Sequence, residues 1–107
     1  MDFPEKMLEA LSLAEDIAPR AFEISYGKGI ALFKLGKYNE ALNEFLKAKN
    51  TSPYKPECYR NLAVTYFKLN DLKSAQDMLA KCLLLNPKDS RAKGYLEQIR
   101  NMNESTK

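Results

Sequence analysis

Three prolines, Pro19, Pro53 and Pro87, follow one another at intervals of 34 residues, and the segments between them repeat with the same period. Shifting the sequence by 34 residues superposes Phe33–Gly36 on Phe67–Asn70. A period of roughly 20 to 50 residues is typical of stacked repeats, in which one unit cannot bury its apolar face alone. The chain is therefore expected to be an array of copies of one structural unit.

The composition limits the class of protein further. The chain has 107 residues, a length typical of one domain, and 45% of them are hydrophobic and 29% charged, which argues against general disorder. No apolar run reaches the roughly 18 residues that a membrane span needs, and no basic-then-apolar leader opens the sequence, so we predict a cytoplasmic protein. The net charge of +3 is small and dispersed, so we predict no nucleic-acid partner, and the lack of an apolar span predicts no membrane partner.

The residue types argue against an enzyme or a metal site. The sequence contains no histidine, which excludes the ordinary catalytic triads and histidine metal sites, and we expect no metal or other cofactor and no catalytic residue. Its two cysteines, Cys58 and Cys82, have no further cysteine or histidine at metal-ligand spacing. We interpret both as small buried side chains with free thiols, the alternative being a disulfide in an exported protein.

Apolar residues recur at steps of three and four, which predicts helices throughout. Gly36 and Asn70 occupy equivalent places after a periodic segment, where the left-handed conformation that ends many helices favours glycine and then asparagine. The pattern predicts six helices with short loops, at residues 4–17, 21–35, 38–49, 55–69, 72–85 and 90–102. The last residues, from Asn101 on, are expected to form a frayed tail.

The residues of the repeat resemble the pattern of the tetratricopeptide repeat family. In the second copy the pattern positions are Tyr59, Leu62, Ala63, Tyr66, Ala75, Leu79 and Pro87. In the first copy they are Ser25, Lys28, Gly29, Leu32, Ala41, Phe45 and Pro53. Ser25 and Lys28 depart from the large apolar residue and the leucine of the family, so the first turns of that helix are expected to pack less tightly.

The resemblance implies an all-α fold, a right-handed α-solenoid of antiparallel helix pairs. Residues 1–107 would be one domain made of two full repeats flanked by partial ones. We expect an N-terminal half repeat at 4–19, full repeats at 22–55 and 56–89, a C-terminal capping helix at 90–102 and a disordered tail at 103–107.

Small residues face each other in this arrangement. Gly29 against Ala41, and Ala63 against Ala75, would let the two helices of a repeat approach closely. A larger side chain at such a contact would cost about 1 to 3 kcal/mol through overpacking.

The family commonly binds peptides or helices on the concave side of the solenoid, which the first helix of each repeat lines. By resemblance, the binding residues are Tyr26, Ile30, Phe33 and Lys34 in the first repeat, Arg60, Asn61, Val64, Phe67 and Lys68 in the second, and Arg91 in the last helix. An apolar floor with a basic rim suits a protein or peptide with hydrophobic anchors and acidic flanks. The alternative is that Phe33 and Phe67 only pack between repeats.

Some members of the family hold the terminal carboxylate of chaperone tails with five lysine, asparagine and arginine residues. Asn61 matches the central asparagine and Arg91 could replace a lysine, but Tyr26, Ile30 and Tyr95 stand at the other three places. Most of the charge-assisted donors of such a clamp are therefore missing.

These features predict a protein-interaction module rather than an enzyme. A second hypothesis is a structural scaffold that self-associates through its incomplete N-terminal repeat. The family would place another helix before the first one. Without that helix, Met7, Leu8, Leu11 and Leu13 are expected to be partly exposed to solvent, and exposed apolar patches mark interfaces.

Overall fold

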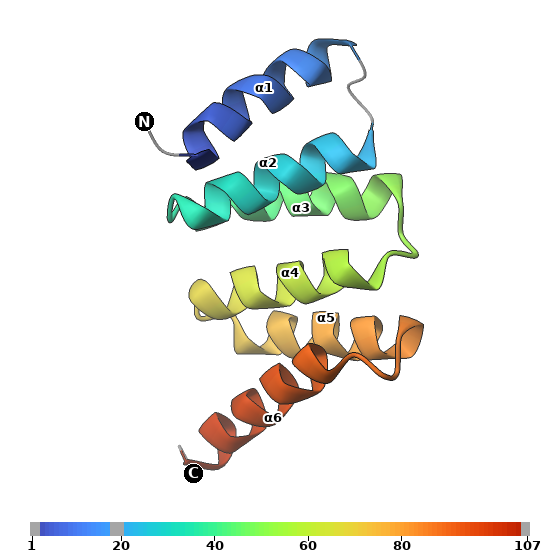
Figure 1. Ribbon diagram of the computed structural model, residues 1–107. Coiled ribbons are helices and arrows are strands. Elements are labelled where there is room, and N and C mark those ends of the chain that lie inside the picture. Colours follow the sequence, from blue (N-terminus) through green and yellow to red (C-terminus); the bar gives the residue numbers. More distant parts are fainter. Residues whose placement is uncertain (1–2, 18–20, 106–107) are drawn as a thin grey trace. The chain divides into compact units, whose positions relative to one another are not determined.

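The computed structural model describes residues 3–17 and 21–105, and the side chains of 14–17, 104 and 105 lie outside that description. Within these residues the chain is entirely helical apart from its turns (Figure 1). The six helices are α1 (Phe3–Ile17), α2 (Phe22–Lys34), α3 (Tyr38–Thr51), α4 (Pro56–Lys68), α5 (Leu72–Leu85) and α6 (Ser90–Ser105). None of these helices is long and apolar enough to cross a membrane.

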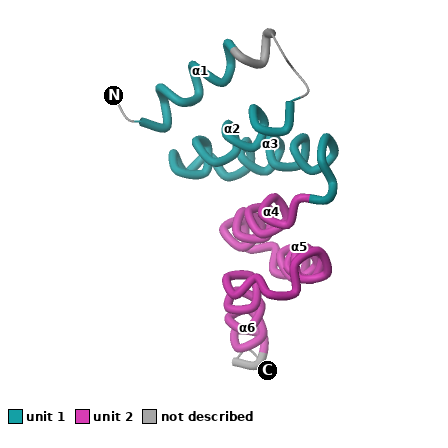
Figure 2. The backbone as a smooth tube through the Cα atoms, turned by 45° about the vertical axis from the view of Figure 1, so that its right-hand side comes forward, with its two compact units in different colours: residues 1–54 teal, residues 55–107 magenta. Residues whose placement is uncertain are grey.

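The chain divides into two compact units, Met1–Tyr54 and Lys55–Lys107, coloured separately in Figure 2. The boundary lies one residue from the predicted start of the second full repeat at residue 56. The first unit contains α1 to α3 and the second α4 to α6. That the whole chain acts as a single domain stays a prediction.

In the first unit, α2 packs against both α1 and α3. Its buried residues recur at helical spacing, and α3 supplies Ala41, Phe45 and Ala48 to the same core. The contact with α1 is close, because a Cβ atom at Gly27 would lie 2.9 Å from a methyl carbon of Leu11. The first proline of the repeat, Pro19, lies outside the described residues.

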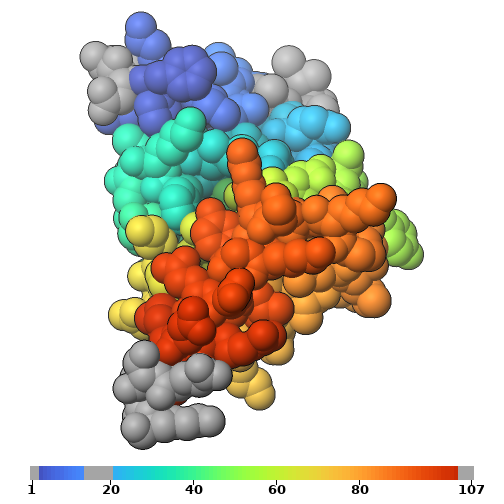
Figure 3. Space-filling view, turned by 60° about the horizontal axis from the view of Figure 1, so that its bottom comes forward, coloured from blue at the N-terminus to red at the C-terminus, as the bar shows by residue number. Residues whose placement is uncertain are grey.

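In the second unit, α5 packs against both α4 and α6. One core joins all three helices; its fully enclosed members are Tyr59, Ala63, Ala75, Leu79, Cys82, Ala92 and Ile99. In Figure 3 the red side chains of α6 lie directly against the orange ones of α5. Cys58 and Cys82 are both fully buried, which confirms that they are core side chains.

The first helix of each pair ends in the same way. Gly36 has φ +78° and Asn70 has φ +63°, which confirms the predicted left-handed residues. The N–H of Lys37 donates to the carbonyl of Leu32 at 2.9 Å, and the N–H of Asp71 donates to the carbonyl of Tyr66 at the same distance. These six-to-one bonds define Schellman motifs, which turn the chain back into the second helix.

The helix bounds differ from the predicted ones mainly at their C-terminal ends. α3 continues through Asn50 to Thr51, two residues that were expected in the turn. α6 continues to Ser105, although a tail was expected from residue 103. Neither proline nor glycine follows Gly94, so nothing in this sequence stops the helix at Met102. Residues 106 and 107 lie outside the described part.

The structure adds Phe45 to the contact predicted at Gly29. Ala41 and Ala75 are fully buried, as close packing requires. The group nearest to Gly29, however, is the aromatic ring of Phe45, one helical turn further along α3 than Ala41. A Cβ atom at Gly29 would lie 2.6 to 2.9 Å from three carbons of this ring, well inside van der Waals contact.

Gly29→Ala should therefore destabilise the protein by about 1 to 3 kcal/mol, because the buried ring of Phe45 has to move. The measurement is the free energy of unfolding in urea. Gly94→Ala is the matched control, since Gly94 lies in α6 with no atom within 4 Å of the added Cβ. That change should stabilise the helix by about 0.5 to 1 kcal/mol. Equal effects of the two substitutions would contradict the close contact.

Candidate interaction surface

The predicted binding residues of the first unit lie along one side of α2. Tyr26, Ile30, Phe33 and Lys34 are separated by steps of four, three and one, which places them on one helix face. The ring of Tyr26 is half-buried: it stacks on Phe22, with centroids 5.1 Å apart, and meets Phe45 edge-on at 5.9 Å. Tyr26 therefore packs over the ring of Phe45, which is buried in the core.

The last two residues of this face differ in exposure. Phe33 is half-buried and packs edge-on against Tyr38, the first residue of α3, with centroids 5.0 Å apart. Lys34, the next residue, is exposed. The face therefore offers an aromatic edge beside a solvated ammonium group.

The second unit repeats this arrangement on α4. Val64 and Phe67 are half-buried, and Phe67 packs against the core of its own unit, while Lys68 is exposed. Asn61 is half-buried, and its backbone carbonyl accepts a hydrogen bond from the Thr65 hydroxyl at 2.7 Å. The structure thus brings the predicted residues together within each unit, where both aromatic rings make packing contacts.

Arg60 is bound inside its own unit. Its guanidinium donates to Asp89, with 2.5 Å between Nη1 and Oδ2. Asp89 is 7% exposed and directly precedes α6, where its other oxygen accepts the N–H of Ala92 at 3.0 Å. The Cys82 thiol donates to the same carboxylate, with 3.4 Å between sulfur and oxygen. One carboxylate therefore joins α4, α5 and the start of α6, while Arg91, the next predicted binding residue, is exposed.

The ionisation of this cluster follows from its surroundings. Burial alone would raise the pKa of Asp89, but hydrogen bonds from Ala92, Arg60 and Cys82, and the charge of Arg60, lower it below its ordinary value. Burial, and then the neighbouring Asp89 carboxylate, raises the pKa of Cys82 to about 11. The thiol is therefore protonated at neutral pH and serves as a donor.

The sequence reasoning did not identify Asp89, which it placed only in a turn. An acidic residue directly before a helix is a recognised capping signal, and Asp89 precedes Ser90 in this way. Its link to Arg60, 29 residues away, has no signal in the sequence. Among the described residues no group of acidic residues or cysteines could hold a metal ion.

The fold agrees with a comparison of the sequence with known families. A family profile described as tetratricopeptide repeat matches residues 32–99, more than half of the chain. The chain therefore belongs to the tetratricopeptide repeat family, whose fold is that of an interaction scaffold, and its architecture is an all-α solenoid of such repeats.

Solved structures share this fold. The first repeat domain of Spaghetti (RPAP3), bound to the HSP90 peptide SRMEEVD, has a TM-score of 0.91 and 19% identity over 94% of this chain and 80% of its own. The second repeat domain of human RPAP3, in complex with the HSP70 peptide SGPTIEEVD, has a TM-score of 0.85 and 20% identity over 91% and 81%. A repeat protein of Thermus thermophilus has a TM-score of 0.81 and 26% identity over 90% and 49%. Among curated protein sequences none matches significantly.

Replacing Asp89 with asparagine should destabilise the protein by about 1 to 3 kcal/mol at neutral pH, because the charged acceptor of Arg60 is lost. The carboxylate has a lowered pKa in the folded state, so its contribution is present above its ordinary value near 3.8. It is lost as the pH falls through the lowered folded-state pKa, where the difference between wild type and variant should shrink. Urea unfolding across this range measures both effects.

Asp77→Asn, at an exposed aspartate of α5, is the control for the removal of one charge. It should change the free energy of unfolding by about 0.5 kcal/mol or less. A destabilisation by Asp89→Asn that stays constant down to acidic pH would show that the charge of Asp89 is not what stabilises the fold.

Proposed function

We propose that this protein binds a partner peptide through the first-helix faces of its repeats, on α2 and α4. The observation that carries the proposal is the repeated pairing of a half-buried phenylalanine with an exposed lysine, Phe33 with Lys34 and Phe67 with Lys68. Neither lysine forms an ion pair with any described residue. Each face therefore combines an apolar contact with a free cation, as a peptide with hydrophobic anchors and acidic flanks requires.

The similar structures support a peptide as the partner. Two of them hold peptides that end in EEVD, which combine acidic residues with an apolar one. In this chain Tyr26, Ile30 and Tyr95 replace three donors of the carboxylate clamp expected from the family. Recognition here would thus depend on side chains within the peptide rather than on its terminal carboxylate.

The other predicted residues would contribute to binding to different extents. Ile30 and Val64 would extend the apolar part, and Asn61 and Arg91 would add hydrogen-bond donors. Arg60 would contribute less to binding because its guanidinium is bound to Asp89. We also propose that the protein is cytoplasmic and acts by binding rather than by catalysis.

Peptides selected from a random library against the purified protein should be enriched in acidic residues next to apolar ones. Lys34→Glu together with Lys68→Glu should weaken binding of the selected peptides by about tenfold or more, because attraction becomes repulsion. Isothermal titration calorimetry measures the loss. The fold should persist, since substitutions of exposed residues shift stability by about 0.5 kcal/mol or less.

The matched control is Lys73→Glu together with Lys81→Glu, which makes the same change of charge at two exposed lysines of α5. An equal loss of affinity in both double variants would mean that net charge, not the first-helix faces, governs binding. Selected peptides without acidic residues would contradict the proposed partner.

The second candidate is self-association through α1. Phe3 and Leu13 are 71% and 68% exposed on this helix. They are ten residues apart, which places them within about 80° of each other around the helix. Exposed apolar residues on one helix face are typical of an interface.

For this candidate, the molecular mass in sedimentation equilibrium should rise with concentration, and Leu13→Glu should keep the protein monomeric. Leu84→Glu is the control, because Leu84 is 75% exposed but lies on α5 in the other unit. A wild-type protein that stays monomeric at every concentration would rule out self-association.

A further inference from the structure

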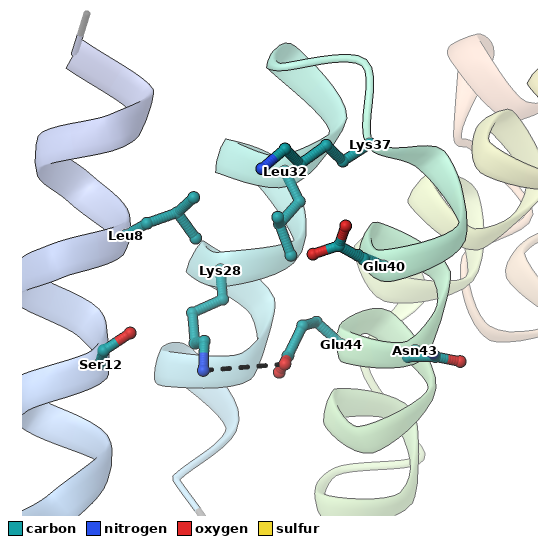
Figure 4. A pocket seen from close by; sticks show the side chains of 8 residues that line it. All are labelled: Leu8, Ser12, Lys28, Leu32, Lys37, Glu40, Asn43 and Glu44. Carbon is teal, nitrogen blue, oxygen red and sulfur yellow. Dashed lines mark ion pairs between the residues drawn. The ribbon is translucent and has the colours of Figure 1, made fainter. Parts of the chain in front are cut away.

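The first unit contains a pocket on the side of α2 opposite to the proposed peptide face. Its volume is about 370 Å³, and it lies between α1 and α3 with α2 as its floor (Figure 4). Lys28 and Leu32 form this floor, and at 100° per residue Lys28 points about 160° away from Ile30 around the helix. The walls are Leu8 and Ser12 of α1, and Glu40, Asn43 and Glu44 of α3, with Lys37 at one end.

Three differences between the two repeats meet in this pocket. Adding 34 to the residue number gives the equivalent residue of the second unit, so Lys28 corresponds to Leu62, Leu32 to Tyr66 and Glu44 to Met78. In the second unit Leu62 is fully buried, and Tyr66 and Met78 pack against the core. The first unit has a shorter side chain in place of the tyrosine, and a lysine and a glutamate in place of the two apolar residues.

The lysine and the glutamate form a pair inside the pocket. Nζ of Lys28 lies 3.7 Å from Oε2 of Glu44, and both side chains are only 14% exposed. Figure 4 shows Glu40 and Glu44 extending from α3 toward Lys28 and Leu32. Taking two charges largely out of water costs free energy that two apolar residues would not, although Glu44 also pairs with Lys47 at 3.5 Å, so an apolar pair would often be at least as stable here. Local rules are most often broken at functional sites.

The chemistry of the missing residue indicates what the pocket accepts. Where the second unit has the phenol ring of Tyr66, the first unit has Leu32, which is 7% exposed at the pocket floor. A ring bound above Leu32 would contact apolar carbons of Leu8 and Leu32 and the ammonium groups of Lys28 and Lys37, which favour aromatic faces. The carboxylate of Glu40 could accept the phenolic hydrogen.

We propose that this pocket binds a tyrosine side chain of a partner protein, which supplies in trans the ring that the second unit carries as Tyr66. The site is separate from the peptide faces of α2 and α4 and does not depend on them. A volume of about 370 Å³ is within the range of small-ligand pockets and can hold one aromatic side chain with part of its backbone.

The test is a titration of ¹⁵N-labelled protein with N-acetyl-L-tyrosinamide, followed by amide chemical shifts. We expect saturable shifts at Leu8, Leu32 and Glu44, with a dissociation constant on the order of 1 mM. N-acetyl-L-leucinamide should bind at least tenfold more weakly, by about 1.4 kcal/mol. Absence of saturable shifts with the tyrosine probe, or equal binding of the leucine probe, would overturn the proposal.

Leu32→Tyr restores the ring within the chain and should weaken binding of the tyrosine probe by about tenfold or more. Ala10→Tyr is the matched control, because it adds the same ring at an exposed position of α1 outside the pocket and should bind the probe as the wild type does. Retained binding in Leu32→Tyr would place the probe elsewhere and refute the site.

A second variant covers the case in which Leu32→Tyr does not fold. Lys28→Leu together with Glu44→Met gives the pocket the apolar pair of the second unit and should also weaken the tyrosine probe about tenfold. Unchanged binding in this double variant would contradict the role of the charges of Lys28 and Glu44. The variant with Lys34→Glu and Lys68→Glu should bind the probe normally, so failure of the peptide proposal and failure of this one are distinguishable.

Discussion

The packing of one helix against the next across a small residue is the constraint on which this structure depends. Gly29 of α2 lies against the ring of Phe45 in α3, and Ala63 of α4 lies in one core with Ala75 and Leu79 of α5. A helix that is apolar along one stripe is not stable alone, so each helix of a repeat requires its neighbour. Contacts at small residues keep the helices near enough to exclude water.

This constraint leaves the remaining faces of the helices free to differ. On α2 one side carries Tyr26, Ile30, Phe33 and Lys34, and the opposite side carries Lys28 and Leu32. The two sides have different chemistry, an aromatic edge with a free cation on one and a pocket with both charges on the other. One helix therefore presents two chemically different surfaces without a change in its core.

In the second unit, several residues equivalent to those of the α2 face and the pocket make contacts within the protein. Leu62 is fully buried, and Tyr66 and Met78 pack against the core of this unit. Arg60 is bound to Asp89, which also caps α6. The two repeats thus share a backbone pattern, but equivalent side chains pack internally in the second unit and line a pocket in the first.

The sequence by itself determined the helices and their order. The period of 34 residues and the apolar spacing predicted six helices, and Gly36 and Asn70 predicted the left-handed turns, because these signals act within a few residues along the chain. The resemblance to the family placed the binding face on α2 and α4, and that assignment stays a prediction.

Only the tertiary structure decided which side chains are engaged across helices. The group nearest to a Cβ at Gly29 is Phe45, Arg60 is held by Asp89, 29 positions further along the chain, and Lys28 meets Glu44 in a pocket. Such pairings depend on how two helices are rotated against each other, and a rotation of one residue changes the angle by about 100°. Helical periodicity identifies the face of a helix that packs, but the partner of each side chain is set by the packed geometry.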